Sequence, residues 1–450
     1  LNRSNTAKSS TRACSQKSDV CGFQETSNSL RSMPPAHHEL SAAKERIVLF
    51  TLTAVQFTHI LDYMIMMPLE SHLMRVFHIG PTEFSHLVAA YGLAAATSGF
   101  AAGFVLDRFD RKHALLALYT GFSVSTVACA LAPTHHALLF ARLAAGAFGG
   151  VASSVVTAMV GDVIPPARRG RAMGMVMVAF PIASVLGVPL GLTLAGWYEW
   201  HAPFFLLTGL SVVILAVAWR SLPELQAHYA PTHPWQQMKN ILANRVHQRG
   251  FLLSAALVFA GGIVIPFLAP SMVANVGLSE SQLPYIYAAG GICTFATTPL
   301  IGRLSDRHDK LHVLGWISLV AASVVVVLTN LPPVSMFVAM VTTAFFMITM
   351  SGRFAPAMAM MTNAVDGRYR GGFMSVNAAV QQASSGLAHL TAGLLVTSDP
   401  NGRLVGYPRV GLVAVACFGL TFFLASRLRA IAPDAAKPGH LRTASIAPLD

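Results

Sequence analysis

Long apolar segments are the feature that most constrains this chain. A membrane-spanning helix needs about 20 mostly apolar residues. Only 11% of the residues are charged and 54% are hydrophobic, whereas soluble domains carry about 25% charged residues. The sequence therefore predicts an all-α integral membrane protein with twelve transmembrane helices, at 46–68, 84–106, 113–132, 136–159, 172–196, 202–220, 249–272, 283–302, 311–330, 334–352, 372–396 and 406–427.

One long polar connection, 221–248, divides these segments six and six. We therefore expect an N-terminal six-helix bundle over 45–220, a cytoplasmic linker over 221–248 and a C-terminal six-helix bundle over 249–427. The first 44 residues are rich in Ser and Thr and predict a disordered polar tail, and 428–450 predict a cytoplasmic tail. Whether residues 1–44 belong to the mature protein stays open.

Lys and Arg are distributed unevenly between alternate loops. With a cytoplasmic N-terminus, the outer loops hold Arg75, Arg403 and Arg409, and all other loop Lys and Arg fall inside. Cytoplasmic loops of membrane proteins carry such an excess of positive charge. Both termini are therefore predicted to be cytoplasmic, and the lipid bilayer is the expected environment.

The same distribution argues against nucleic acid as a partner, although the net charge is +12. The basic residues lie in short clusters between apolar segments, without a zinc pattern or an aromatic platform. The five Cys are scattered, with Cys14 and Cys21 in the tail, and show no metal-ligand spacing. No GxxxxGK[ST] motif for nucleotide phosphates is present. We expect no cofactor and no metal.

Two charged loops repeat each other about 200 residues apart. Gly103, Asp107 and Arg108 match Gly302, Asp306 and Arg307, and a further Asp follows each set, at 110 and 309. Both loops follow the second predicted helix of their half. This internal repeat predicts two parallel halves with one architecture. A topology anchor is the simpler interpretation of either loop alone, and two matching loops favour a gate.

At these residues the chain resembles the major facilitator superfamily. The signature loop G-x-x-x-D-R-x-x-R-K corresponds to Gly103, Asp107, Arg108, Arg111 and Lys112. The resemblance implies two pseudo-symmetric six-helix bundles that rock about a central cavity. It also implies that this loop latches the cytoplasmic side, with its Asp at the start of helix eleven near 370–372. The second glycine of the pattern is replaced by Asp110, and by Asp309 in the second copy.

Helix four carries Arg142, the one basic residue that the sequence places deep in a predicted helix. A buried charge in a membrane is costly and should face a cavity or a partner. Arg142, Gly146, Gly149 and Gly150 resemble the R-x-x-x-G-x-x-G pattern of the family, which implies a role in proton transfer. The alternative is that Arg142 snorkels to the outer interface.

Helix one carries Asp62, the one acidic residue inside a predicted helix. A carboxyl group in a low-dielectric cavity can bind and release protons near neutral pH, and the position resembles that of the aspartate in twelve-helix drug:proton antiporters. The alternative is a capped or paired structural Asp. Gln56, His59 and Tyr63 share its helix at i+3 and i+4 spacings and are candidates for a substrate cavity, although His59 alone is more typical of a structural polar residue.

Helices five and eleven contribute further candidates. Gly187, Pro189 and Gly191 in helix five resemble a shortened antiporter motif, although tight helix packing would equally explain these residues. In helix eleven, Asn377 and Gln381 begin a polar stripe that continues at Ser385. Such side chains need polar partners in a membrane, and either a wet cavity or a neighbouring helix would supply them.

These features predict a proton-coupled secondary active transporter that exports a small drug-like or sugar-like molecule by alternating access. The incomplete antiporter motif leaves a second interpretation, a proton symporter that imports a sugar or an organic acid. A membrane enzyme or receptor is a remote alternative, because the His residues are dispersed and no loop is long enough for a folded domain. The resemblance implies a multi-pass protein of the bacterial inner membrane, and we expect a monomer.

Overall fold

The computed structural model describes residues 41–105, 109–224, 234–367 and 369–437. The polar tail with Cys14 and Cys21, and the motif residues Asp107 and Arg108, lie outside the described residues. Within the described residues the chain is almost entirely helical, as expected. The short exception is a two-stranded antiparallel pair of β1 (Thr397–Ser398) and β2 (Leu404–Val405).

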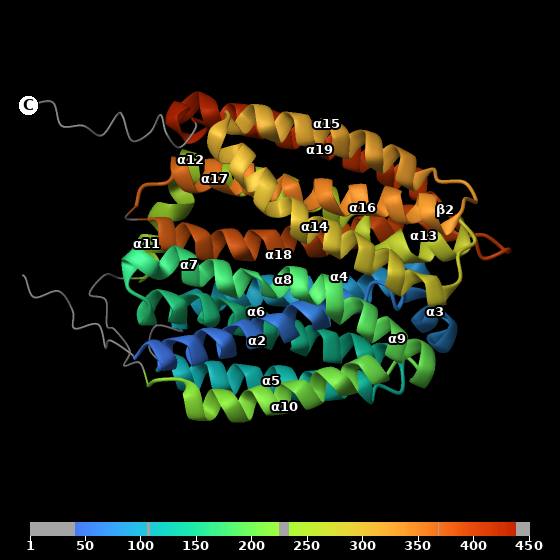
Figure 1. The fold of residues 1–450 in the computed structure, drawn as a ribbon, viewed down its shortest axis with the longest axis horizontal. Helices are drawn as coiled ribbons and strands as arrows, with labels where there is room; N and C mark the ends of the chain where they lie inside the picture. The colour runs from blue at the N-terminus through green and yellow to red at the C-terminus, as the bar shows by residue number, and fades with distance from the viewer. Residues whose placement is uncertain (1–40, 106–108, 225–233, 368, 438–450) are drawn as a thin grey trace, which may run out of the picture. The chain divides into compact units, whose positions relative to one another are not determined.

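The N-terminal half, residues 42–221, contains the first group of helices (Figure 1). They are α2 (Ala42–Ile65), α3 (Glu70–Phe77), α4 (Pro81–Val105), α5 (Arg111–Ala130), α6 (His135–Val163), α7 (Pro166–Met177), α8 (Ala179–Ile182), the π-helical turn η2 (Ala183–Gly187), α9 (Val188–Tyr198) and α10 (Ala202–Ser221). The predicted helix five corresponds to α7 through α9, in which a π-turn lies between two prolines, Pro181 and Pro189.

The C-terminal half, residues 245–431, contains the second group. Its elements are α12 (Arg245–Gly262), η3 (Ile265–Phe267), α13 (Leu268–Ala274), η4 (Glu280–Gln282), α14 (Leu283–Arg307), α15 (Lys310–Thr329), α16 (Met336–Gly352), α17 (Phe354–Ala364), α18 (Arg370–Leu395) and α19 (Tyr407–Ile431). The linker between the halves includes α11 (Pro234–Ala243), and η5 (Pro433–Ala435) follows α19.

The two halves start corresponding helices in the same way. Asp110 accepts a hydrogen bond from the backbone N–H of His113 and caps α5. Asp309 accepts from the backbone N–H groups of Leu311 and His312 and caps α15. A side-chain oxygen at this position satisfies N–H groups that have no partner in the first turn of a helix. The aspartates that depart from the family pattern therefore have a local structural role.

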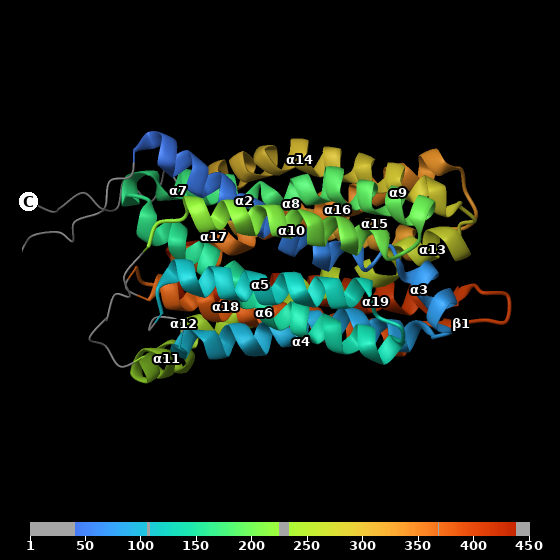
Figure 2. The same ribbon diagram turned by 90° about the horizontal axis from the view of Figure 1, so that it is seen from below.

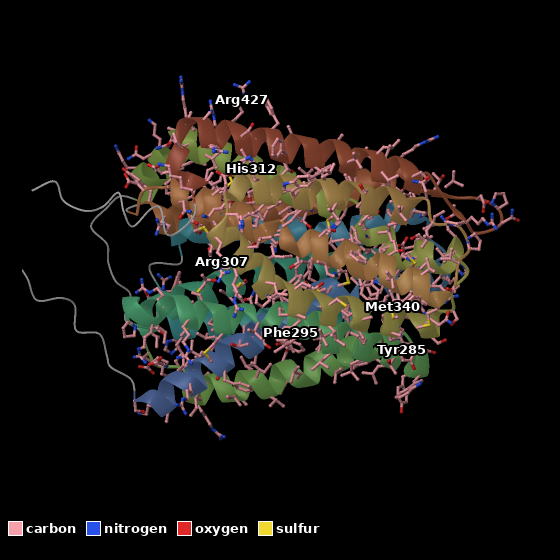
Figure 3. All side chains as sticks on the ribbon, turned by 45° about the horizontal axis from the view of Figure 1, so that its top comes forward. Tyr285, Phe295, Arg307, His312, Met340 and Arg427 are labelled. Carbon is pink, nitrogen blue, oxygen red and sulfur yellow. The ribbon has the colours of Figure 1, made fainter. Side chains whose placement is uncertain are left out.

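Nine helical segments are long and apolar enough to cross a membrane, among the residues that the structure describes. The helices α4, α14 and α18 fall outside those nine, but they contain 25, 25 and 26 residues. At 1.5 Å per residue, each is about as long as a bilayer is thick. Large apolar side chains such as Tyr285 and Phe295 project from α14 with more than half of their surface exposed (Figure 3). The chain is a multi-pass membrane protein, and the full count of twelve stays a prediction.

Two predicted helix ends are wrong by five residues or more. Helix eight was expected to end at residue 302, before a loop over 303–310, but α14 continues to Arg307. Helix ten was expected to end at residue 352, with Arg353 in a cytoplasmic loop, but the helical span continues from Met336 to Ala364. Arg353 is the N-cap of α17 and has no exposed surface. Its guanidinium lies 4.3 Å above the ring of Phe418, and Nη2 donates to the sulfur of Met350 at 3.0 Å. Arg142 is therefore not the one basic residue deep in a helix.

The halves contact each other mainly through α4 with α18, and through α14 with η2 and α9. Figures 1 and 2 show α3 and the β-strands toward one end of the helices and α11 toward the other, and we call these the α3 end and the α11 end. At the α3 end, Arg75 of α3 donates to Glu280 of η4 at 2.7 Å, and Thr82 donates to the carbonyl of Gly393 at 2.9 Å. Both bonds join the two halves.

Candidate transport site

Asp62 and Arg142 form a buried ion pair. Nη1 of Arg142 on α6 lies 2.7 Å from Oδ2 of Asp62 on α2, and neither side chain has exposed surface. The same nitrogen also donates to the backbone carbonyl of Asp62 at 3.3 Å. Taking two charges out of water is expensive, and only close pairing offsets the cost. The alternative that Arg142 snorkels to the outer interface does not fit this burial, and Asp62 is paired with Arg142.

Aromatic rings enclose this pair. The guanidinium of Arg142 lies 4.4 Å from the ring centroid of Tyr91 on α4. The Tyr91 ring is also 5.8 Å from His59 and 5.5 Å from Tyr63, measured between centroids. A cation over an aromatic face is attracted by the ring quadrupole. Tyr91 was not among the sequence candidates, because an isolated Tyr in an apolar helix carries no pattern.

Several polar atoms of the cluster have no hydrogen-bond partner among the described residues. They are Oδ1 of Asp62, Nε and Nη2 of Arg142, and both ring nitrogens of His59. Buried polar groups are nearly always satisfied by protein or by water. These atoms can therefore bind further polar groups, water included.

A second set of contacts joins this cluster to the C-terminal half. The hydroxyl of Tyr63 lies 2.7 Å from Oγ of Ser385 and 3.5 Å from Nε2 of His389, both on α18. His389 is buried, and its Nδ1 has no hydrogen-bond partner within the described residues. His389 was not among the residues predicted for the site, although it continues the four-residue spacing of Asn377, Gln381 and Ser385. Following that stripe one step further would have found it.

The remaining cavity candidates are mostly bonded to neighbouring helices. Ser153 of α6 donates to the side-chain oxygen of Gln56 at 3.0 Å. Gln381 donates to Ser254 of α12 at 3.0 Å. Asn377 is buried, and its side-chain oxygen has no partner among the described residues. The polar stripe of helix eleven was expected to find its partners in a wet cavity or on a neighbouring helix. Gln381 and Ser385 find theirs on neighbouring helices.

Glycines bring the helices of the site together. A Cβ atom added at Gly146 would collide with the backbone carbonyl of Tyr91, so α6 and α4 touch there without side chains between them. Added Cβ atoms at Gly187 and Gly191 would come within 2.7 Å of Leu61 and 2.5 Å of Ile65 on α2. The glycines of helix five therefore serve close packing against α2, as the simpler interpretation expects.

The repeated loops lie away from the ion pair. Arg111 contacts Asp162 at 3.4 Å, within the N-terminal half. In the second copy, Gly302, Asp306 and Arg307 belong to the last turns of α14, where Asp306 and Arg307 are exposed. Gly103 is partly buried in α4, and Lys112 is in the first turn of α5. The expected contact of Asp107 with the start of α18 involves a residue outside the described part of the chain.

Sequence comparisons with known proteins point to one family. The sequence profile of the Major Facilitator Superfamily matches residues 52–259 and 250–448. The Bacillus subtilis protein named uncharacterized MFS-type transporter YceJ is 25% identical over 363 residues, which cover 79% of this chain and 91% of the relative. A probable sugar efflux transporter of Helicobacter pylori strain G27 is 23% identical over 59% of this chain and 67% of the relative.

Solved structures share the fold. A bacterial homologue of the human lysosomal transporter Spinster, in an inward-facing and occupied conformation, has a TM-score of 0.71 at 18% identity, covering 86% of this chain and 98% of that one. A D-xylose-proton symporter has a TM-score of 0.68 at 17% identity, with coverages of 86% and 97%. The chain belongs to the major facilitator superfamily, and it is a transporter and not an enzyme.

Proposed function

We propose that this major facilitator superfamily transporter exports a small organic molecule in exchange for protons. The observation that carries the proposal is the ion pair of Asp62 and Arg142, which is fully buried and retains polar atoms without partners. Membrane proteins seldom keep ionisable groups at such depth without a functional reason. Asp62 is the proposed proton carrier and Arg142 its counter-charge.

The proposed coupling follows from the chemistry of the pair. A proton on Asp62 neutralises the carboxylate and leaves the guanidinium of Arg142 without its anion. The conformation that pairs the two residues is thereby weakened, and the cavity can open toward the other side. Substrate and proton compete, because a polar group of the substrate and the proton both bind the carboxylate of Asp62, whose Oδ1 has no hydrogen-bond partner among the described residues.

We further propose that the α11 end faces the cytoplasm, in a bacterial inner membrane, and that both termini lie there. The concentration of Lys and Arg in the loops of that end supports this orientation. The bonds of Arg75 and Thr82 across the halves lie at the opposite end, which supports an inward-facing state closed on the outside. The loop from Gly103 to Lys112 would close the α11 end in the other state.

Export is preferred to import for two reasons. The helix-five residues Gly187, Pro189 and Gly191 resemble an antiporter motif, and one relative is named a sugar efflux transporter. The import alternative is a proton symporter for a sugar or an organic acid, with Arg142 as the ligand of a carboxylate. The two alternatives differ in the sign of proton movement when substrate is added.

Purified protein in liposomes that contain a pH-sensitive dye tests the proposal. Hydrophobic cations, sugars and organic acids are added one at a time without an imposed gradient. We expect one class to move protons in the direction opposite to its own. Movement of protons together with the solute would establish the symporter instead.

The variant Asp62→Asn tests the role of the carboxyl group with the active solute. We expect exchange of solute across the membrane without a gradient to persist, and transport driven by a pH gradient to be lost. Glu83→Gln, which neutralises an exposed carboxyl group on α4, is the matched control and should behave as the wild type. Retained coupling in Asp62→Asn would refute the assignment of Asp62.

A further inference from the structure

Glu70 is a buried acid that the proposed coupling does not use. It begins α3, the short helix between the spans of α2 and α4, and it has no exposed surface. Neither oxygen of its carboxyl group has a hydrogen-bond partner among the described residues. An isolated ionised carboxylate in such surroundings is strongly disfavoured, and the group is neutral instead.

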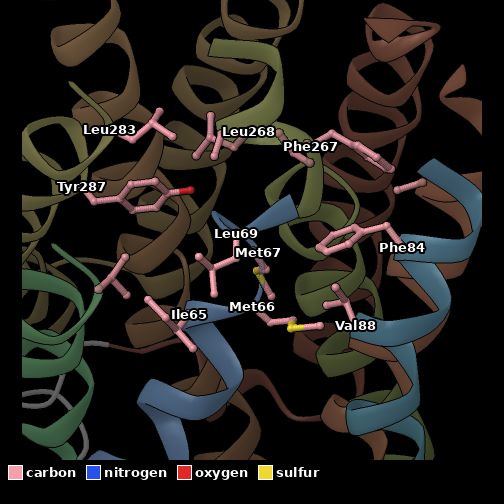
Figure 4. Close-up of a cluster of buried hydrophobic side chains, with 14 of the residues drawn as sticks. Ile65, Met66, Met67, Leu69, Phe84, Val88, Phe267, Leu268, Leu283 and Tyr287 are labelled. Atoms are coloured by element: carbon pink, nitrogen blue, oxygen red, sulfur yellow. The ribbon is translucent and has the colours of Figure 1, made fainter. Parts of the chain in front are cut away.

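The surroundings of Glu70 come from both halves of the chain. Its neighbour Leu69 belongs to a buried apolar cluster that also includes Leu268 of α13 and Leu283 of α14 (Figure 4). In that view the hydroxyl of Tyr287 on α14 points toward the segment that carries Leu69. Contacts between α3 and α13 complete this seam at the α3 end. The residue therefore lies where the N-terminal half meets the C-terminal half.

Among the described residues, two phenols of the C-terminal half, Tyr287 of α14 and Tyr407 of α19, are near enough to interact with a charge on Glu70. The hydroxyl of Tyr407 donates to the carbonyl of Val264, and that of Tyr287 has no partner among the described residues. The helix α13 contains no ionisable residue.

The other ionisable side chains of α3 and α4 either contact groups other than Glu70 or are exposed. On α3 itself, His72 and Arg75 lie 3.4 Å and 2.7 Å from the carboxylate of Glu280. On α4, Glu83 accepts a hydrogen bond from the backbone N–H of Gly80, and His86 is exposed. No cation within the described residues compensates Glu70, and burial raises the pKa of its carboxyl group well above the usual range. The first turn of α3 favours negative charge, but it does not outweigh this burial.

We propose that Glu70 is a second proton-binding site of the transporter, separate from Asp62, which holds its proton while the α3 end is closed and releases it when that end opens. Opening must separate α3 from α13 and α14, because they belong to different halves. Water then reaches the carboxyl group, and its pKa returns toward about 4.3. The proton enters and leaves on the α3 side, so this site biases the conformational equilibrium by pH and carries no proton across the membrane.

The sign of the pH dependence follows from linkage. Glu70 has the higher pKa in the closed state, so protonation of Glu70 stabilises that state. The stabilisation is fully present below the pKa of the open state and is lost as pH rises through the pKa of the closed state. Between the two pKa values, the ratio of closed to open molecules falls about tenfold for each pH unit. Low pH therefore favours closure of the α3 end. This inference rests neither on the direction of transport nor on coupling at Asp62.

Distances between spin labels across the α3 end test the proposal. His136→Cys, in the first turn of α6, and Ser335→Cys, the residue before α16, place labels at exposed positions of the two halves, after the five native Cys have been replaced. The protein is reconstituted in lipid nanodiscs and measured between pH 4 and pH 9, without substrate. In the otherwise unchanged sequence we expect a short distance at low pH and a growing long-distance population as pH rises.

Four variants decide the assignment. Glu70→Gln should keep the short distance at every pH, Glu70→Asp should restore a titration, and Glu83→Gln should titrate as the parent does. His72→Gln should also leave the titration in place, which separates Glu70 from the neighbouring histidine. If Glu70→Gln does not fold, Glu70→Asp alone remains informative, because the shorter carboxyl group should move the midpoint.

Asp62→Asn in the same labelled background separates this proposal from the proposed function. If the distance between the labels still depends on pH in Asp62→Asn but no longer does in Glu70→Gln, the assignment of Glu70 as the proton-binding site is supported, whatever the transport assay shows. A titration that is the same in Glu70→Gln as in the parent would overturn the inference, as would one that vanishes only in Asp62→Asn. A parent that shows a single distance at every pH would also overturn it.

Discussion

At the scale of single residues, Asp62 and Arg142 depend on each other. Both side chains lack exposed surface and their charged atoms are 2.7 Å apart. Removal of one partner from a buried pair leaves an uncompensated charge, whereas removal of both leaves a neutral cavity. The ring of Tyr91, 4.4 Å from the guanidinium, cannot replace the missing anion or cation.

This dependence predicts a non-additive effect on stability. Arg142→Met should lower the free energy of unfolding by about 3–5 kcal/mol, because Asp62 is left buried without its partner. The double variant Asp62→Asn with Arg142→Met should recover most of that loss. Thermal unfolding of the purified protein in detergent, for both single variants and the double variant, measures the coupling. Additive losses would show that the two residues act independently.

At the scale of elements, glycine decides how closely α6 and α4 approach. A Cβ atom at Gly146 would meet the Tyr91 backbone, which cannot rotate away as a side chain can. The same helix contains Gly161, where an added Cβ atom meets nothing within 4 Å. The two positions therefore separate the effect of packing from that of helix propensity.

We predict opposite outcomes for alanine at these two positions. Gly146→Ala should destabilise the protein by about 1–3 kcal/mol, because the helices must shift apart. Gly161→Ala should be neutral or stabilising by up to about 1 kcal/mol, since alanine favours a helix. Melting temperatures of the two variants, compared with the parent, provide the measurement. Equal shifts would contradict close backbone contact at Gly146.

At the scale of the whole molecule, hydrogen bonds join the two halves at the α3 end. Arg75 and Glu280 are partly exposed, with 62% and 34% of their side-chain surface accessible. An exposed ion pair of this kind stabilises the state closed at the α3 end by about 0.2–1 kcal/mol. Glu280→Gln should therefore raise the population open at the α3 end by at most about fivefold.

The labels at positions 136 and 335 measure that population. The effect should shrink in high salt, because exposed charges are screened. The charge-reversed double variant Arg75→Glu with Glu280→Arg should restore the parent distribution. A Glu280→Gln variant with an unchanged distribution at low salt would mean that the pair does not hold the two halves together.

Much of the fold was predictable from local sequence. Apolar segments of about 20 residues gave the positions of the helices to within a few residues in most cases, because a bilayer demands that length. The repeated Gly-x-x-x-Asp-Arg loops predicted two related halves, and Asp110 and Asp309 indeed cap corresponding helices. Helices eight and ten were exceptions. Helix eight continues through the charged residues 303–307, and Arg353 resembles a loop residue until its burial against Phe418 is known.

The sequence by itself determined the class of protein and the family resemblance, and it made Asp62 and Arg142 candidates for the site, since charges are rare and costly in apolar helices. Only the tertiary structure decided that these two residues pair, that His389 joins Tyr63, and that Glu70 is buried between the halves. Contacts between segments 80 to 326 residues apart depend on how the helices pack, and neither local hydropathy nor spacing along one helix records that packing.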